Sequence, residues 1–230
     1  MIVKQLAFDL ARTARPTLDN FVVGHNAELV QHLRELGGSL EHERSIYIWG
    51  ARGSGRTHLL QATLASLEQR GWRVSYTAGG AQPPESADDI DVTGVDDVDV
   101  LSAAAQVALF NLYNGLRERG GVVLAAGNAP PAELRLRADV VTRLAWGLVY
   151  EVHALTDDDK MHALVQHAAA RGFELPPDVT QYLLSRVRRD MRTLIAVLEA
   201  LDRYSLETKR AVTVTLAREM LLETSMHGME

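Results

Sequence analysis

The sequence predicts an α/β domain built on a parallel sheet, followed by a small all-helical domain. Short apolar runs alternate with helix-like runs up to about residue 154, and strands separated by helices usually form a parallel sheet that helices cover. A glycine-rich stretch joins the first of these strands to the helix after it. Beyond Leu155 the apolar spacing is that of helices only.

We therefore divide the 230-residue chain into an extended tail at 1–15, an α/β domain at 16–154 and a helical lid domain at 155–230. We expect a sheet of five parallel strands, near residues 45–49, 72–76, 90–95, 122–126 and 148–152. The helices of the α/β domain are expected at about 25–36, from the glycine-rich stretch to 70, and at 102–119. In the lid domain, helices should begin after Thr156, Pro176 and Asp190 and near Leu216.

Composition excludes several classes of protein. Hydrophobic residues make up 47% of the chain, enough for a sizeable core, and the net charge of −6 argues against general electrostatic binding of nucleic acid. Without cysteine there is no disulfide or thiolate metal site, which is compatible with a reducing compartment. The sequence shows neither a signal peptide nor an 18-residue apolar run. We expect a cytoplasmic protein.

The glycine-rich stretch Gly50–Thr57 fits the G-x-x-x-x-G-K-[ST] phosphate-binding pattern, except that Arg56 stands where lysine is usual. Its glycines let the backbone turn tightly and aim several N–H groups at one anion, and the helix that follows adds its positive end. Thr57 would place a hydroxyl on a nucleotide-bound magnesium ion. The alternative is a glycine-rich connection that binds nothing. The candidate nucleotide-binding residues are Gly50, Gly53, Ser54, Gly55, Arg56, Thr57 and His58.

Asp96 and Asp97 are the candidate carboxylates at the end of the third strand. A P-loop nucleotidase needs a carboxylate at the end of a neighbouring strand to order magnesium and water. We assign Asp96 as the carboxylate on the magnesium side. Thr93-Gly94 interrupts the apolar run of the supporting strand, and several other aspartates crowd the region, so a solvated acidic loop is the alternative. Asp97 is shorter than the glutamate that usually polarises water, which predicts slow hydrolysis.

Two further features are ambiguous from residue types alone. In the tail, Gln5 precedes the spaced apolar residues Leu6, Phe8 and Leu10. These four residues form either a peptide ligand for an apolar groove or a strand that packs on its own domain, and the residues by themselves favour the strand. Arg143 and Arg192 are, by type, more often surface salt-bridge formers than catalytic groups. Their positions after the fourth strand and within the lid domain draw attention to them.

Together these motifs resemble the AAA+ ATPases of the DnaA replication-initiator type, over roughly residues 17–222. The resemblance is carried by the phosphate loop, Asp96-Asp97 at a strand end, and Gly127-Asn128 at the sensor 1 position. It also includes Arg143 before Leu-Ala-Trp-Gly, which is similar to box VII, and Arg192 in Met-Arg-Thr-Leu, which looks like sensor 2. The Pro/Asp-rich stretch at 78–92 matches no motif of the family.

Within this family the chain resembles the Hda-like inactivators of DnaA. These proteins have arginine in the phosphate loop, begin with a short clamp-binding peptide and lack the initiator's C-terminal DNA-binding domain. The resemblance reverses the interpretation of the tail: Gln5, Leu6, Phe8 and Leu10 become a clamp-binding peptide. It implies bound ADP or ATP with Mg, contacted by Arg192 from the lid, and weak or no intrinsic ATPase activity.

The implied partners are DnaA and the β sliding clamp of DNA polymerase III, with DNA reached only through the clamp. Arg143 would act in trans on the ATP of DnaA, and Asp96, Asp97 and Asn128 would complete the chain's own catalytic set. Self-association into a homodimer or a larger assembly stays open. Two other functions also stay open: a self-sufficient AAA+ ATPase such as a replicative helicase loader, and a DNA-binding initiator fragment. The net charge of −6 argues against the second of these.

Overall fold

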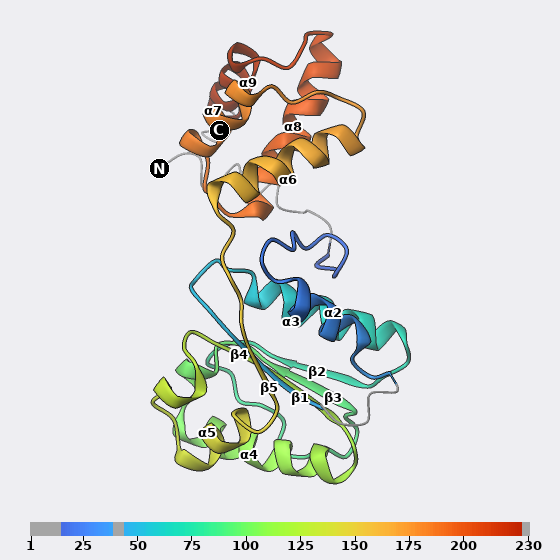
Figure 1. Cartoon of the computed structure of the whole chain (residues 1–230), viewed down its shortest axis with the longest axis vertical. Helices are drawn as coiled ribbons and strands as arrows, with labels where there is room; N and C mark the ends of the chain where they lie inside the picture. Colours follow the sequence, from blue (N-terminus) through green and yellow to red (C-terminus); the bar gives the residue numbers. More distant parts are fainter. Residues whose placement is uncertain (1–14, 39–43, 227–230) are drawn as a thin grey trace. The chain divides into compact units, whose positions relative to one another are not determined.

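The computed structural model describes residues 15–38 and 44–226, which form two compact units, Arg15–Ala154 and the residues from Leu155 on (Figure 1). The four residues of the expected clamp-binding peptide, Gln5, Leu6, Phe8 and Leu10, lie outside the described residues. Among the helices described, none is long and apolar enough to cross a membrane.

A five-stranded sheet organises the first unit, in the order β2-β3-β4-β1-β5. Every neighbouring pair is parallel, which confirms the predicted fold class. The first strand in sequence is near the middle of the sheet, between β4 and β5. The strands are β1 (Ser45–Trp49), β2 (Val74–Thr77), β3 (Val92–Val95), β4 (Val122–Gly127) and β5 (Leu148–Glu151).

Helices cover both faces of the sheet because strand side chains alternate between the faces (Figure 1). Ile46 and Ile48 of β1 share one apolar cluster with α2 and α3, whereas Tyr47 between them belongs to a second cluster with α4 and α5. The helices of this unit are α2 (Ala27–Glu35), α3 (Arg56–Gln69), α4 (Ala103–Glu118) and α5 (Ala138–Leu144), with short 3-10 turns η1 (Val98–Val100) and η2 (Pro131–Glu133). Helix α5 was not expected from the sequence.

The third strand is intact across Thr93-Gly94, where the sequence suggested an interruption. All four residues of β3 are buried, and Gly94 lies against α3. A Cβ at Gly94 would approach Leu64 Cδ1 to 2.5 Å, so the glycine permits close helix–sheet packing rather than weakening the strand. The strand ends at Val95, which places Asp96 directly after it.

The second unit is a helical lid with a core of its own. It contains α6 (Asp157–Ala170), α7 (Pro177–Arg186), α8 (Met191–Thr208) and α9 (Val214–Met226). Leucines from each helix meet in one buried cluster, among them Leu164, Leu183, Leu198 and Leu216. The starts of these helices follow the expected chemistry. Thr156 and Asp159 form a reciprocal capping box at α6, and the Asp190 side chain accepts the N–H of Thr193 at α8.

The first prediction tests the packing of α3 on β3. Gly94→Ala should lower the free energy of unfolding by roughly 1–3 kcal/mol, because the added methyl group overpacks a filled core against Leu64. Thr93→Val is the matched control on the same strand. The Thr93 hydroxyl is buried without a hydrogen-bond partner among the described residues, so its removal should be neutral or stabilising. Urea unfolding of both variants checks this, and an unchanged Gly94→Ala midpoint would refute the packing argument.

Candidate functional site

The phosphate loop Gly50–Thr57 joins the end of β1 to the start of α3, and its glycines allow two close approaches. A Cβ at Gly50 would lie 2.5 Å from the carbonyl oxygen of Val152, and one at Gly55 would lie 2.7 Å from the ring of Phe21. Gly55 also has φ of 105°, in the left-handed region that favours glycine. The loop is thus held between the end of β5 and the N-terminal segment.

Several polar atoms of this loop have no partner in the described part of the chain. Ser54 Oγ and Arg56 Nη1 are buried and unpaired there, and Ser54 N–H donates to the carbonyl of Ala51 at 3.1 Å. No acceptor within residues 15–38 and 44–226 takes the backbone N–H groups of Gly53, Gly55, Arg56 and Thr57. Buried polar groups are nearly always paired in folded proteins, so Ser54 Oγ and Arg56 Nη1 fit a bound phosphate. The free N–H groups at the start of α3 are of the kind that binds anions.

Arg56 and Asp97, which the sequence analysis treated separately, meet in an ion pair. Arg56 Nη2 lies 3.3 Å from Asp97 Oδ1, and the arginine side chain is only 11% exposed. Burial raises the pKa of Asp97, the neighbouring Asp96 carboxylate raises it further, and Arg56 opposes both effects only in part. The cation at the lysine position therefore has a carboxylate partner within its own chain.

Asp96 lies at the end of β3 and is 3% exposed, so it does not belong to a solvated acidic loop. Its Oδ1 accepts the N–H of Asp97 at 3.0 Å, and its Oδ2 accepts the hydroxyl of Tyr76 at 3.2 Å. Sequence reasoning missed Tyr76, whose role depends on the pairing of β2 with β3. These bonds fix the carboxylate at the edge of the sheet where the phosphate loop begins.

Few side-chain oxygens are available as ligands for magnesium. Thr57 is in the first turn of α3 and is exposed, and each oxygen of Asp96 already accepts one hydrogen bond. In the described part of the chain no group of three or more His, Cys, Asp or Glu residues is arranged to hold a metal. A magnesium ion here would therefore depend on nucleotide phosphates and water for most of its ligands, as is usual for this ion.

Asn128 follows β4, next to β3 and β1 in the sheet. Its backbone N–H and side-chain amide donate to the two oxygens of Asp99, at 3.0 and 2.8 Å, which identifies Asp99 as a supporting residue that the sequence analysis left among the solvated acids. Because the carboxyl ends of parallel strands meet at one edge, Gly50, Asp96 and Asn128 are brought to the same edge of the sheet.

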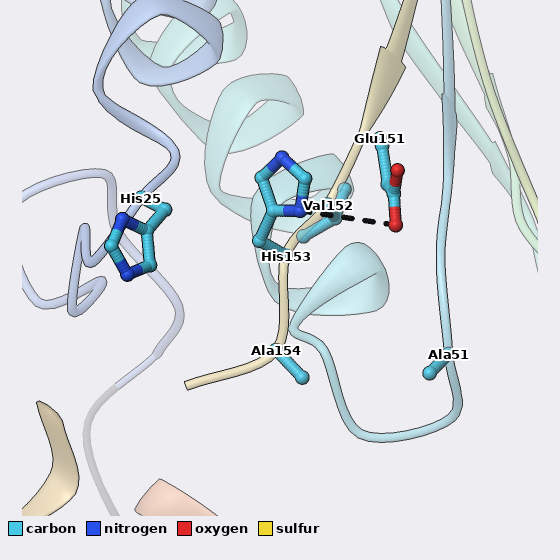
Figure 2. Close-up of a pocket in the computed structure, with 6 residues that line it drawn as sticks. All are labelled: His25, Ala51, Glu151, Val152, His153 and Ala154. Carbon is cyan, nitrogen blue, oxygen red and sulfur yellow. Dashed lines mark ion pairs between the residues drawn. The ribbon is translucent and has the colours of Figure 1, made fainter. Parts of the chain in front are cut away.

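A hollow of about 490 Å³ opens beside the phosphate loop, as Figure 2 shows. One histidine of its lining comes from the loop before α2, and another follows β5. The ring of His153 lies 3.8 Å from the carboxylate of Glu151, Nδ1 to Oε1. The lining residues are His25, Ala51, Glu151, Val152, His153 and Ala154. Its volume lies in the range usual for small-molecule sites.

Asn26, which is 3% exposed, connects the two chain segments that line this hollow. Its amide donates to the carbonyls of Val23 and His153 at 3.1 and 3.0 Å, and its Oδ1 accepts the N–H of His153 at 2.8 Å. The side chain therefore ties the loop before α2 to the segment after β5. No sequence motif indicated this role, because the partners are 127 residues apart.

His58, a predicted nucleotide-binding residue, directs its ring toward the N-terminal segment. Its Nε2 lies 3.0 Å from the carbonyl oxygen of Thr17, and its ring is 5.5 Å from that of Phe21. Arg192, the predicted lid contact, lies in the first turn of α8 within the second unit.

Arg143 occupies the last turn of α5, away from the phosphate loop. The chain just beyond it packs on the start of β1, since a Cβ at Gly147 would lie 1.9 Å from the carbonyl oxygen of Ser45. This is the amino edge of the sheet, whereas the phosphate loop leaves the carboxyl edge. The Nε of Arg143 donates to Asn114 Oδ1 at 2.9 Å. No carboxylate of the described chain pairs with the Arg143 side chain. The salt-bridge interpretation of Arg143 is therefore unsupported.

The second prediction concerns the Asn26 fastening. Asn26→Asp should lower the free energy of unfolding by roughly 2 kcal/mol or more, because a carboxylate cannot donate to the two carbonyls that the amide satisfies. Asn20→Asp is the matched control, because Asn20 is exposed in the same N-terminal segment and its change should cost much less. Chemical denaturation measures both; equal effects would show that the fastening is unimportant.

Known proteins resemble this chain in both of its units. Residues 157–221 match the family model of the Hda lid domain. Domain III of DnaA from Thermotoga maritima is similar with a TM-score of 0.70 and 21% identity, over 92% of this chain and 98% of that chain. AMPPCP-bound DnaA from Aquifex aeolicus has a TM-score of 0.67 and 24% identity, over 85% and 67%. A RuvB structure from Thermotoga maritima has a TM-score of 0.61 and 15% identity, over 92% of this chain and 72% of that chain. The chain thus has the fold of domain III of DnaA, and residues 157–221 of its second unit match the Hda lid domain.

Proposed function

We propose that this chain is a nucleotide-bound regulator that docks on the DNA polymerase sliding clamp and stimulates ATP hydrolysis by DnaA, which restrains the initiation of replication. One observation carries the proposal. An arginine with no carboxylate partner among the described residues lies at the sheet edge opposite the chain's own phosphate loop, in a DnaA-like chain that has an Hda lid.

The nucleotide is ADP or ATP. Its phosphates would take the unpaired N–H groups of the loop, Ser54 Oγ and Arg56 Nη1. Its base or ribose would lie in the hollow beside Ala51 and His153, with Arg192 contributing from the lid. The similar DnaA of Aquifex aeolicus is an AMPPCP-bound structure, which supports a nucleotide ligand. Magnesium, held at Thr57 and Asp96, would neutralise charge on the phosphates.

Intrinsic hydrolysis should be weak. Asp97 is paired with Arg56 at 3.3 Å, so its carboxylate is not free to orient water. Asn128 is likewise occupied by both oxygens of Asp99. Arg56 is held by Asp97 rather than free to follow a γ-phosphate during transfer, and a guanidinium is bulkier than the usual ammonium. The site supports retention of nucleotide better than its turnover, and it should accept the diphosphate.

The partner interactions extend this proposal. Arg143 would reach the γ-phosphate of ATP on DnaA and neutralise charge that develops in the transition state. The peptide Gln5, Leu6, Phe8 and Leu10 would bind the sliding clamp, with the glutamine hydrogen-bonding and the apolar residues as anchors. Contact with DNA would then be indirect, through the clamp.

A self-sufficient AAA+ ATPase, such as a helicase loader, is the second candidate. It is favoured by one observation: Asp96, Asp97 and Asn128 gather at the carboxyl edge where the phosphate loop begins. That function requires appreciable ATP turnover by the purified chain alone. Steady-state phosphate release from the isolated protein separates the two candidates.

The third prediction tests the nucleotide site. Arg56→Ala should weaken ADP binding at least tenfold, since hydrogen bonds to charged groups contribute about 1.5–3 kcal/mol. Arg52→Ala removes the same charge from an exposed position of the same loop and should change affinity only slightly. Isothermal titration with ADP measures both, with melting temperature as the check on folding. Wild-type affinity in folded Arg56→Ala would contradict this assignment.

The fourth prediction tests the function itself. Clamp loaded on DNA, DnaA carrying labelled ATP and this protein should together release labelled phosphate, and omission of any one should return release to its basal rate. Arg143→Ala should abolish stimulation because no other group replaces the guanidinium, yet leave ADP binding intact. Gln5→Ala with Leu6→Ala should weaken clamp binding at least tenfold.

Arg137→Ala is the control for Arg143→Ala. Arg137 lies at the start of α5 and is paired with Asp139, so its loss should leave stimulation unchanged. Normal stimulation by folded Arg143→Ala would overturn the assignment of Arg143. Stimulation without the clamp would overturn the role of the tail.

A further inference from the structure

Neutral groups hold the guanidinium of Arg143 in place. Its Nε donates to Asn114 Oδ1 at 2.9 Å, and its Cζ lies 3.9 Å from the ring centroid of Trp146 and 5.1 Å from that of Phe110. Phe110 and Asn114 are four residues apart on α4 and therefore share one face of that helix. Within the described chain the arginine is thus oriented by an amide and two aromatic rings, without a counter-ion.

The backbone next to Trp146 is closely packed. The next residue, Gly147, packs so closely on Ser45 that a Cβ there would lie 1.9 Å from its carbonyl oxygen. The indole is 50% exposed, and a second cation, the Arg117 guanidinium, lies 4.5 Å from its ring centroid. Two positive charges therefore share one aromatic ring at the surface of α4 and α5.

The terminal nitrogens of Arg143 remain available. Across residues 15–38 and 44–226, neither Nη1 nor Nη2 has a hydrogen-bond or ion-pair partner. A guanidinium that is tied at Nε and stacked on a ring has lost much of its rotamer freedom before it meets a ligand, which lowers the entropy cost of binding. Its two terminal amino groups match the paired oxygens of a phosphate.

We propose that Asn114 and Trp146 are positioning residues that aim Arg143 at a phosphate on a partner protein, and that an amide at position 114 is required to leave the charge of Arg143 uncompensated. The inference rests on the proposed role of Arg143 in trans. The amide fixes the arginine as a carboxylate would, but without cancelling the charge that the partner's phosphate needs. Arg117 adds positive potential beside it.

Asn114→Asp separates orientation from charge. The aspartate is nearly isosteric and can still accept from Arg143 Nε, so the variant should melt at the wild-type temperature or above. Its carboxylate should cancel the arginine charge, and stimulated phosphate release from DnaA should fall at least tenfold. The loss should appear in the maximal rate at saturating DnaA, because charge stabilisation acts mainly on the transition state.

Two comparisons make this test specific. Asn111→Asp adds the same charge to an exposed position one turn earlier on α4 and should keep wild-type stimulation. Trp146→Ala should lose stimulation, and Trp146→Phe should restore part of it, because a smaller ring can still stack on the guanidinium.

The outcomes distinguish this inference from the proposed function. If Arg143→Ala abolishes stimulation but Asn114→Asp stimulates normally, the positioning inference is wrong and the proposed function stands. If Arg143→Ala stimulates normally, the proposed function fails. If Asn111→Asp loses as much activity as Asn114→Asp, general surface charge explains the effect, which also overturns the inference.

Discussion

The position of β1 between β4 and β5 in a parallel sheet is the constraint on which the rest of the first unit depends. Parallel pairing sends the carboxyl ends of β1, β3 and β4 to one edge, where Gly50, Asp96 and Asn128 follow them. The chain must then return to the amino edge before it can enter β5, and α5 makes that return. Arg143 lies at its end. Five residues of β1, at about 3.3 Å each, separate the two edges.

That separation gives the two ends of the sheet different electrostatics. At the carboxyl edge, Arg56 is nearly buried and already paired with Asp97, while Ser54 Oγ and Arg56 Nη1 lack partners among the residues described. Such an arrangement favours a bound anion over a reacting one. At the amino edge, Arg143 and Arg117 stack on an exposed indole, and Arg143 is left uncompensated by its Asn114 partner. The first edge suits a retained nucleotide, and the second suits a partner's phosphate.

The fold and the phosphate loop were predictable because their signals are local. Glycine spacing, apolar runs and the capping pair Thr156–Asp159 each act within a few residues, and the predicted AAA+ fold with a helical lid is confirmed. Helix α5 was missed because seven residues are too short to establish a period. Gly94 was wrongly expected to interrupt its strand. The glycine is needed for close packing against Leu64, which lies thirty positions earlier in the sequence. The side chains that support the site could not be predicted either, because their partners are distant in the sequence. Asn26 contacts His153, and Asn114 contacts Arg143, only after the sheet has formed.

The most direct test of the central claim asks whether Arg143 acts on the chain's own nucleotide. Single-turnover hydrolysis of ATP bound to the isolated protein should be measured for wild type and Arg143→Ala, at a concentration where both are shown to be monomeric. Because the arginine lies at the far edge of the sheet from the phosphate loop, we expect equal, slow rates for the two proteins. A clearly slower rate in Arg143→Ala would show that the arginine serves its own site, and would contradict action in trans.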